Sequence, residues 1–142
     1  MIRNLSLGDG TPKICVPLTG DTCEALCREA EKAKAASADM AEWRADFFQY
    51  LSDEEKIKET LKEIAGILSG IPLLFTVRTK EEGGQAEITP EEYRKVNLAA
   101  AESGLADLVD VEIFSQENPL ELIGAIQEKG AKVIASSHDF QK

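Results

Sequence analysis

The sequence predicts an α/β fold of the (β/α)8 TIM-barrel type, here an incomplete barrel of about five parallel strands and four helices in one domain spanning residues 1–142. Short apolar runs alternate with helical patterns along the chain. The runs begin about 25 to 35 residues apart, close to the period of about 30 residues expected when a barrel of about 250 residues is divided by eight. Polar side chains also recur on one face of successive strands, which favours a barrel.

Each strand is expected where an apolar run lies, at residues 13–18, 39–45, 72–77, 107–113 and 132–137. Ahead of them, residues 2–7 and the turn Gly8-Asp9-Gly10 predict a short N-terminal β-hairpin, whose extra strand pairs back onto the first parallel strand. Helix N-termini are indicated by capping residues followed by acidic or proline residues: Ser52 with Glu55, Thr89 with Pro90 and Glu92, and Asn118 with Pro119 and Glu121. The helices are expected to end at Gly70, Gly104 and Gly130.

The period of the strands alone does not separate a barrel from an open, doubly wound sheet, so the side-chain pattern decides. Strands of an open parallel sheet are buried on both faces and are nearly continuous hydrophobic runs. In this sequence alternate positions of four strands are polar, which suits the carboxyl-terminal rim of a barrel, where charges meet one another and a polar ligand. These positions are Glu42, Arg44 and Asp46; Thr76 and Arg78; Asp110 and Glu112; and Ser136 and His138.

Composition excludes several classes of function. With 16 basic and 26 acidic residues the net charge is -10, which argues against a nucleic acid or an anionic membrane as partner. Apolar runs are too short for a membrane span and no signal-peptide core is present, so a cytoplasmic protein is expected. Cys23 and Cys27 are one helical turn apart and are expected to face the core as small apolar residues, with no metal site.

Each polar feature also has a plain structural explanation. Glu42 with Arg44 could form a structural ion pair, and His138 alone could be a hydrogen-bonding residue at a strand end. The loop over residues 79–85 could be an exposed acidic turn with two flexible glycines. Taken together, however, the groups combine two arginines suited to a carboxylate or hydroxylated anion with a histidine and carboxylates that could orient it.

Four motifs closely resemble type I 3-dehydroquinate dehydratase, the Schiff-base-forming dehydratase of the shikimate pathway in aromatic amino acid biosynthesis. They are E-W-R-A-D at 42–46, L-L-F-T-V-R-T-K-E-E-G-G at 73–84, A-A-A-E-S-G-L-A-D-L-V-D-V-E at 99–112 and S-S-H-D-F at 136–140. The resemblance covers the whole chain in order. It implies a lyase that converts 3-dehydroquinate to 3-dehydroshikimate and water, without a metal or organic cofactor.

The resemblance also implies a role for each site residue. His138 matches the general acid/base and Glu82 the carboxylate that orients it. Glu42, Arg44 and Arg78 match residues of the substrate pocket. Supporting polar groups are expected at Asp46, Asp110 and Glu112.

The resemblance extends over the N-terminal five-eighths of the enzyme. The family's Schiff-base lysine lies on a sixth strand beyond the histidine, and neither Lys132 nor Lys142 matches it. We therefore expect the chain by itself to be inactive and, with two open sheet edges, to form a homo-oligomer, here a dimer. One alternative is a noncatalytic sugar-acid binding or assembly module derived from this barrel, and another is a lyase or aldolase of the same barrel class acting on a different hydroxylated keto acid.

Overall fold

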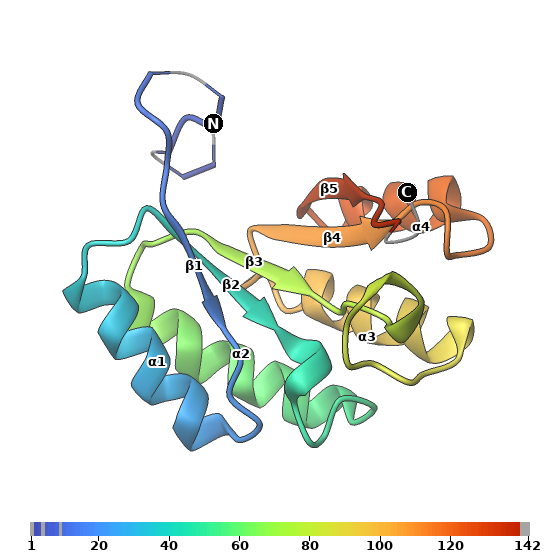
Figure 1. Cartoon of the computed structure of the whole chain (residues 1–142), viewed down its shortest axis with the longest axis horizontal. Coiled ribbons are helices and arrows are strands. Elements are labelled where there is room, and N and C mark those ends of the chain that lie inside the picture. Colours follow the sequence, from blue (N-terminus) through green and yellow to red (C-terminus); the bar gives the residue numbers. More distant parts are fainter. Residues whose placement is uncertain (1, 4, 9, 140–142) are drawn as a thin grey trace.

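Five parallel strands form one curved sheet in the computed structural model, which describes residues 2–3, 5–8 and 10–139 (Figure 1). The strands pair in chain order, each with the next along the sequence. Their bounds are β1 (Cys15–Leu18), β2 (Met40–Arg44), β3 (Leu73–Thr76), β4 (Leu108–Glu112) and β5 (Lys132–Ser136). The predicted strands and their parallel arrangement are confirmed, with ends shifted by up to two residues.

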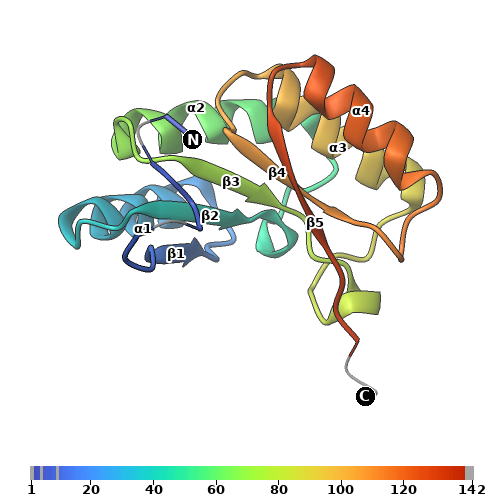
Figure 2. The same cartoon turned by 90° about the horizontal axis from the view of Figure 1, so that it is seen from above.

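Four helices connect the strands and follow one another along one side of the sheet (Figures 1 and 2). They are α1 (Cys23–Ala35), α2 (Glu54–Leu68), α3 (Pro90–Glu102) and α4 (Pro119–Glu128). Neighbouring helices in the chain pack against each other in the same order as the strands. This is the arrangement of consecutive βα units in a barrel wall. Within the described part of the chain, no helix has the length and apolar character that crossing a membrane requires.

The two faces of the sheet carry opposite chemistry. Side chains that point toward the helices are apolar and buried; for example Ala41, Trp43 and Phe75 have no exposed surface. Trp43 packs edge-on against Phe75 at a centroid distance of 5.3 Å, a geometry that aromatic pairs prefer. The opposite face is polar toward the carboxyl ends of the strands. The predicted separation into apolar and polar faces is therefore confirmed.

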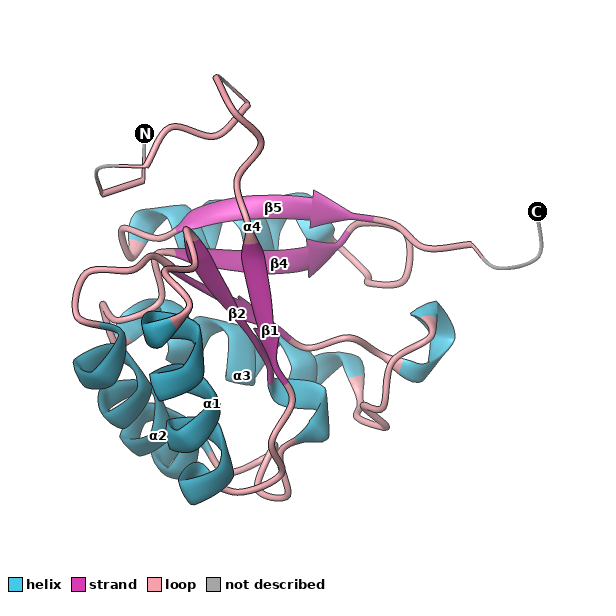
Figure 3. Ribbon diagram, turned by 60° about the vertical axis from the view of Figure 1, so that its left-hand side comes forward, coloured by secondary structure: helices cyan, strands magenta, loops and turns pink. Residues whose placement is uncertain are grey.

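A small apolar cluster closes the amino end of the polar face. Ile2 packs there with Met40, Leu74 and Leu108, which come from the first half of their strands. Because this end is filled by apolar side chains, polar groups gather at the other end of the strands. Figure 3 shows the N-terminal segment at the amino ends of the strands and the chain leaving β5 at the opposite end.

The predicted N-terminal hairpin is wrong in its pairing. Among the described residues of the segment before β1, an isolated antiparallel bridge joins Ile2 and Leu5, and the sheet consists of the five parallel strands. Ile2 packs in the apolar cluster with residues of β2, β3 and β4 instead of pairing along β1. Asp9, at the centre of the predicted turn, lies outside the described residues.

The helix caps follow the predictions in part. Thr89 and Glu92 form the expected reciprocal capping box at the start of α3. At α2 the cap is Asp53 rather than Ser52: the Asp53 carboxylate accepts hydrogen bonds from the backbone N–H groups of Glu55 and Lys56 at 3.1 Å. The Ser52 hydroxyl instead donates to Glu92. Asn118 is at the N-cap position of α4 but makes no capping hydrogen bond through its side chain.

The glycines predicted to end helices are confirmed as the residues that follow the C-caps. Gly70, Gly104 and Gly130 have φ values of 100°, 73° and 94°. This left-handed backbone conformation is tolerated best by glycine and lets the chain leave the helix toward the next strand.

We expect Asp53→Ala to lower the free energy of unfolding by about 1 kcal/mol, because two backbone donors at the start of α2 lose their acceptor. Ser52→Ala is the matched control and should change it by less than about 0.5 kcal/mol, since its hydrogen bond is exposed. Urea unfolding of the two variants measures the difference. Equal losses would contradict the assignment of the cap to Asp53.

Candidate active site

The carboxyl ends of the strands bring the eight predicted site residues to one rim of the sheet. The residues come from the strands or from the loops that directly follow them. Glu42 and Arg44 are on β2, Asp46 is in the short helix η1 (Ala45–Phe47), Arg78 follows β3, Glu82 is in η2 (Lys80–Glu82), Asp110 and Glu112 are on β4, and His138 follows β5.

Glu82 and His138 form the predicted carboxylate–histidine pair. Oε1 of Glu82 is 3.1 Å from Nδ1 of His138 and also accepts a hydrogen bond of 2.9 Å from the His138 backbone N–H. The Glu82 side chain is 4% exposed, whereas that of His138 is 40% exposed. A carboxylate at Nδ1 favours the proton on that nitrogen, which leaves Nε2 as the basic atom of the neutral ring.

The loop between β3 and α3 places Glu82 by folding tightly. The Gly84 N–H donates to the Thr79 carbonyl at 2.8 Å, and the Ala86 N–H donates to the Arg78 carbonyl at 3.1 Å. Gly83 has φ of 87°, and a Cβ on Gly84 would come within 2.1 Å of the Arg78 carbonyl oxygen. Both glycines are therefore required by the backbone. Lys80, Glu81 and Gln85 are exposed, as the alternative of an acidic turn expects, but Glu82 is buried.

Arg78 is held by two buried carboxylates. Its Nη1 donates to Glu112 at 3.0 Å and to Asp110 at 3.2 Å, while its Nη2 donates to Asp110 at 3.1 Å. The Ser136 hydroxyl accepts another Nη1 hydrogen bond at 3.0 Å. Burial by itself would lower the pKa of Arg78, but the hydrogen bonds and charges of Asp110 and Glu112 outweigh it and raise that pKa. The cluster thus joins β3, β4 and β5.

Arg44 forms its ion pair with Asp46 and not with Glu42. The guanidinium donates through Nε and Nη2 to both oxygens of Asp46 at 2.8 Å, the two-pronged geometry that arginine makes with carboxylates. This hydrogen bonding raises the pKa of Arg44. Glu42 instead accepts a hydrogen bond of 2.8 Å from the Thr76 hydroxyl. The alternative of a Glu42–Arg44 structural pair is therefore wrong.

Three residues that contact the site were missed as site residues. The Thr79 hydroxyl donates to Glu112 at 2.7 Å, and the Ser115 hydroxyl donates to Oε2 of Glu82. The buried Tyr93 hydroxyl accepts from the Glu112 backbone N–H at 3.0 Å, and burial raises the pKa of this phenol. Thr79 and Ser115 follow strand ends closely, which is the signal that could have found them. Tyr93 falls in the apolar pattern of its helix, so its hydroxyl gave no sequence signal.

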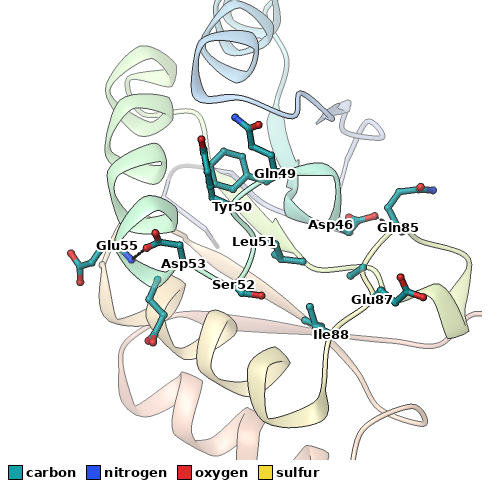
Figure 4. A pocket seen from close by; sticks show the side chains of 13 residues that line it. Asp46, Gln49, Tyr50, Leu51, Ser52, Asp53, Glu55, Gln85, Glu87 and Ile88 are labelled. Atoms are coloured by element: carbon teal, nitrogen blue, oxygen red, sulfur yellow. Dashed lines mark hydrogen bonds between the residues drawn. The ribbon is translucent and has the colours of Figure 1, made fainter.

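A pocket of about 880 Å³ lies beside the polar rim, between the loops that follow β2 and β3 (Figure 4). Asp46 and Gln85 meet at its edge, where the Gln85 N–H donates to Asp46 at 3.0 Å. Asp53, Glu55 and Glu87 add acidic groups to a lining that also includes Leu51 and Ile88. Of the predicted site residues, Asp46 alone contributes to the described lining, so the pocket is separate from the Glu82–His138 pair.

The cysteine pair differs from the expectation. Cys23 and Cys27 are half-buried and line a surface pocket between α1 and α2 instead of facing the core. Their sulfur atoms are 4.0 Å apart. Burial, together with Cys23, raises the pKa of the Cys27 thiol to about 11. Among the described residues, no group of three or more histidine, cysteine or acidic side chains is arranged to hold a metal ion.

The geometry defines a class of protein, a segment of a TIM barrel with a polar, histidine-containing rim, and comparison with known proteins identifies the family. Residues 14–142 match the family model for type I 3-dehydroquinase. The chain belongs to this family.

Relatives and solved structures agree with this assignment. A 3-dehydroquinate dehydratase from Syntrophotalea carbinolica is 46% identical over 142 residues, covering 99% of this chain and 56% of that protein. One from Listeria innocua is 44% identical over 143 residues, covering 100% of this chain and 57% of that protein. The structure of a type I 3-dehydroquinate dehydratase from Clostridium difficile, with covalently modified comenic acid, superposes with a TM-score of 0.95 at 39% identity and covers 100% of this chain and 56% of that one. The chain thus spans little more than half the length of these relatives, and the barrel fold is confirmed.

We expect Arg78→Met to lower the free energy of unfolding by about 3–5 kcal/mol, because Asp110 and Glu112 would remain buried without a cation. Arg28→Met, on the exposed face of α1, is the matched control and should cost less than about 0.5 kcal/mol. Urea unfolding at neutral pH measures both. Similar stabilities of the two variants would show that the cluster is not a structural centre of the fold.

Proposed function

We propose that this chain supplies the acid/base half of a 3-dehydroquinate dehydratase of the Schiff-base type, acting in the cytoplasm in aromatic amino acid biosynthesis. The observation that carries the proposal is the buried Glu82 carboxylate at 3.1 Å from Nδ1 of a half-exposed histidine, on the rim where barrel enzymes bind their substrates. The 142 residues would form the N-terminal five-eighths of the barrel. No metal or organic cofactor is needed for this chemistry.

The proposed reaction removes a proton and a hydroxyl group from neighbouring carbons of 3-dehydroquinate. With its proton on Nδ1 directed at Glu82, His138 would take the substrate proton through Nε2. The ring then carries a positive charge, which the Glu82 carboxylate stabilises. His138 returns this proton to the departing hydroxyl, which leaves as water, and the carbon–carbon double bond of 3-dehydroshikimate forms.

Arg44 and Glu42 are the groups on β2 that would contact the substrate. The hydrogen bonds described for Arg44 use Nε and Nη2, so the N–H groups of Nη1 remain as donors for a hydroxyl or carboxylate. Arg78 is different, because Asp110, Glu112 and Ser136 engage both of its terminal nitrogens. We therefore assign Arg78 mainly to the charge balance and geometry of the pocket.

From the resemblance to the family, we expect the Schiff-base lysine on a strand beyond the one that leads to His138. An imine at the substrate ketone draws electrons from the neighbouring C–H bond, and without it His138 would have to take a proton from an unactivated ketone. The proposed role of the 142 residues is therefore acid/base chemistry and substrate contact, with the nucleophile supplied by the rest of the barrel.

We expect the 142-residue chain to form no product when 3-dehydroquinate is added, as judged by ultraviolet absorbance of the conjugated product. Borohydride treatment followed by intact-mass measurement should reveal no trapped adduct. When the chain is fused to the C-terminal part of a family relative, both signals should appear. Product without the fusion would contradict the proposed division of the chemistry.

In the fused protein, His138→Ala should lower turnover by about 10²–10⁴-fold, the usual contribution of a general acid/base. Adduct trapping should persist in this variant, because the lysine attacks the ketone. Full turnover by the variant would remove His138 from the mechanism. Binding of substrate without turnover or adduct in the fusion would instead favour a noncatalytic sugar-acid binding module.

We also propose that the 142-residue chain self-associates as a dimer. β1 and β5 are the edges of the described sheet, and unpaired edge strands promote pairing with a second chain. The acidic net charge of -10 opposes association, so the dimer fraction should rise with salt, which screens this repulsion. Light scattering over a dilution series measures it. A monomer at all concentrations and salt levels would contradict this proposal.

A further inference from the structure

The Glu82–His138 pair is part of a longer chain of contacts that includes Ser115. Glu82 uses its two carboxylate oxygens for different partners: Oε1 faces His138, and Oε2 accepts the hydroxyl hydrogen bond of Ser115. In the described part of the chain, Ser115 is the donor that reaches Oε2. The three residues come from the segments that follow β3, β4 and β5.

Ser115 bears on how the carboxylate is oriented. A glutamate carboxylate turns readily about its last side-chain bond, because that rotation has a broad, nearly two-fold energy profile. A donor at each oxygen fixes the rotation, so Oε1 is kept on Nδ1. The Glu82 side chain is 4% exposed, and a buried carboxylate oxygen that loses its donor is costly, which gives the Ser115 contact energetic weight.

The backbone links the loop of Ser115 to the histidine strand. The N–H of Ile113, two residues before Ser115, donates to the Ser136 carbonyl at 3.0 Å, and Ser136 is two residues before His138. The loop and the strand end are therefore held in register by a contact next to both. This connection gives Ser115 a fixed position relative to the imidazole as well as to the carboxylate.

We propose that Ser115 is a positioning residue for the acid/base histidine: through Oε2 of Glu82 it holds Oε1 on Nδ1 and so sets the tautomer of His138. This inference rests on the proposed function for its catalytic meaning. The effect of the Ser115 hydroxyl on the tautomer of His138 can be measured without substrate.

His138 is the single histidine of the chain, so imidazole ¹⁵N resonances of the labelled 142-residue protein report on it alone. The spectra are recorded at a pH where a titration of the same sample shows a neutral ring. The wild-type protein should carry its proton on Nδ1. In Ser115→Ala, the ratio of the Nε2–H to the Nδ1–H tautomer should rise about fivefold, the effect of losing a hydrogen bond of ordinary net strength.

Two further variants separate positioning from general disturbance. Ser115→Thr keeps the hydroxyl and should restore the wild-type tautomer, while Ser137→Ala removes a hydroxyl next to His138 and should leave it unchanged. Amide spectra of all variants check that the fold is kept. Wild-type ¹⁵N shifts in Ser115→Ala would overturn the proposal, since a water molecule could then replace the hydroxyl, and failure of Ser115→Thr to restore them would do the same.

The outcome is distinguishable from a failure of the proposed function. An unchanged tautomer in Ser115→Ala removes the role of Ser115 and leaves the dehydratase assay of the fused protein as it was. A changed tautomer in Ser115→Ala, together with a fused protein that makes neither product nor adduct, supports the positioning role and overturns the proposed dehydratase function.

Discussion

The site depends on one electrostatic constraint: two carboxylates are buried on β4, and a single guanidinium must compensate them. Glu112 has no exposed surface and Asp110 is 4% exposed, so each would be destabilising without a cation within hydrogen-bonding distance. Arg78 donates to both carboxylates. The Ser136 hydroxyl accepts from Arg78 and donates to Asp110, and the Thr79 hydroxyl donates to the other oxygen of Glu112. Because these groups come from β4, β5 and the loop after β3, the ion cluster fixes the relative positions of the strand ends.

The geometry of the Glu82–His138 pair follows from that cluster through the backbone. The side chain of Arg78 is held by the ion cluster. Its backbone carbonyl accepts a hydrogen bond from the Ala86 N–H and lies against Gly84, so the loop that carries Glu82 is fixed at Arg78. Ser136 contacts Arg78 and Asp110, and His138 follows it by two residues. Both members of the proposed acid/base pair are thus positioned from the same buried arginine.

Sequence patterns could predict the strands and the polar face, because each depends on periodicity within one segment. The choice of Glu82 and the roles of the candidate residues came from the resemblance to the family. The patterns could not predict which charges pair. Glu42 and Arg44 are neighbours on one strand face, yet Arg44 reaches forward to Asp46 in η1 and Glu42 crosses to Thr76 on β3. Ser115 and Tyr93 were missed for the same reason, since their partners are 33 and 19 residues away in the chain. The N-terminal hairpin was mispredicted because burial of Ile2 with β2, β3 and β4 outweighs local turn signals.

The net charge of the rim affects how an anionic substrate could bind. Among the eight predicted residues, five are carboxylates and two are guanidiniums, so the rim carries three formal negative charges when His138 is neutral. The proposed substrate is itself a carboxylate and would be repelled by such a surface. Among these eight residues, Arg44 keeps the N–H groups of Nη1 outside the described ion pair, so the proposed contact with the substrate carboxylate depends on this arginine. The buried cluster and the proposed substrate contact thus meet the same physical requirement, a cation close to each anion.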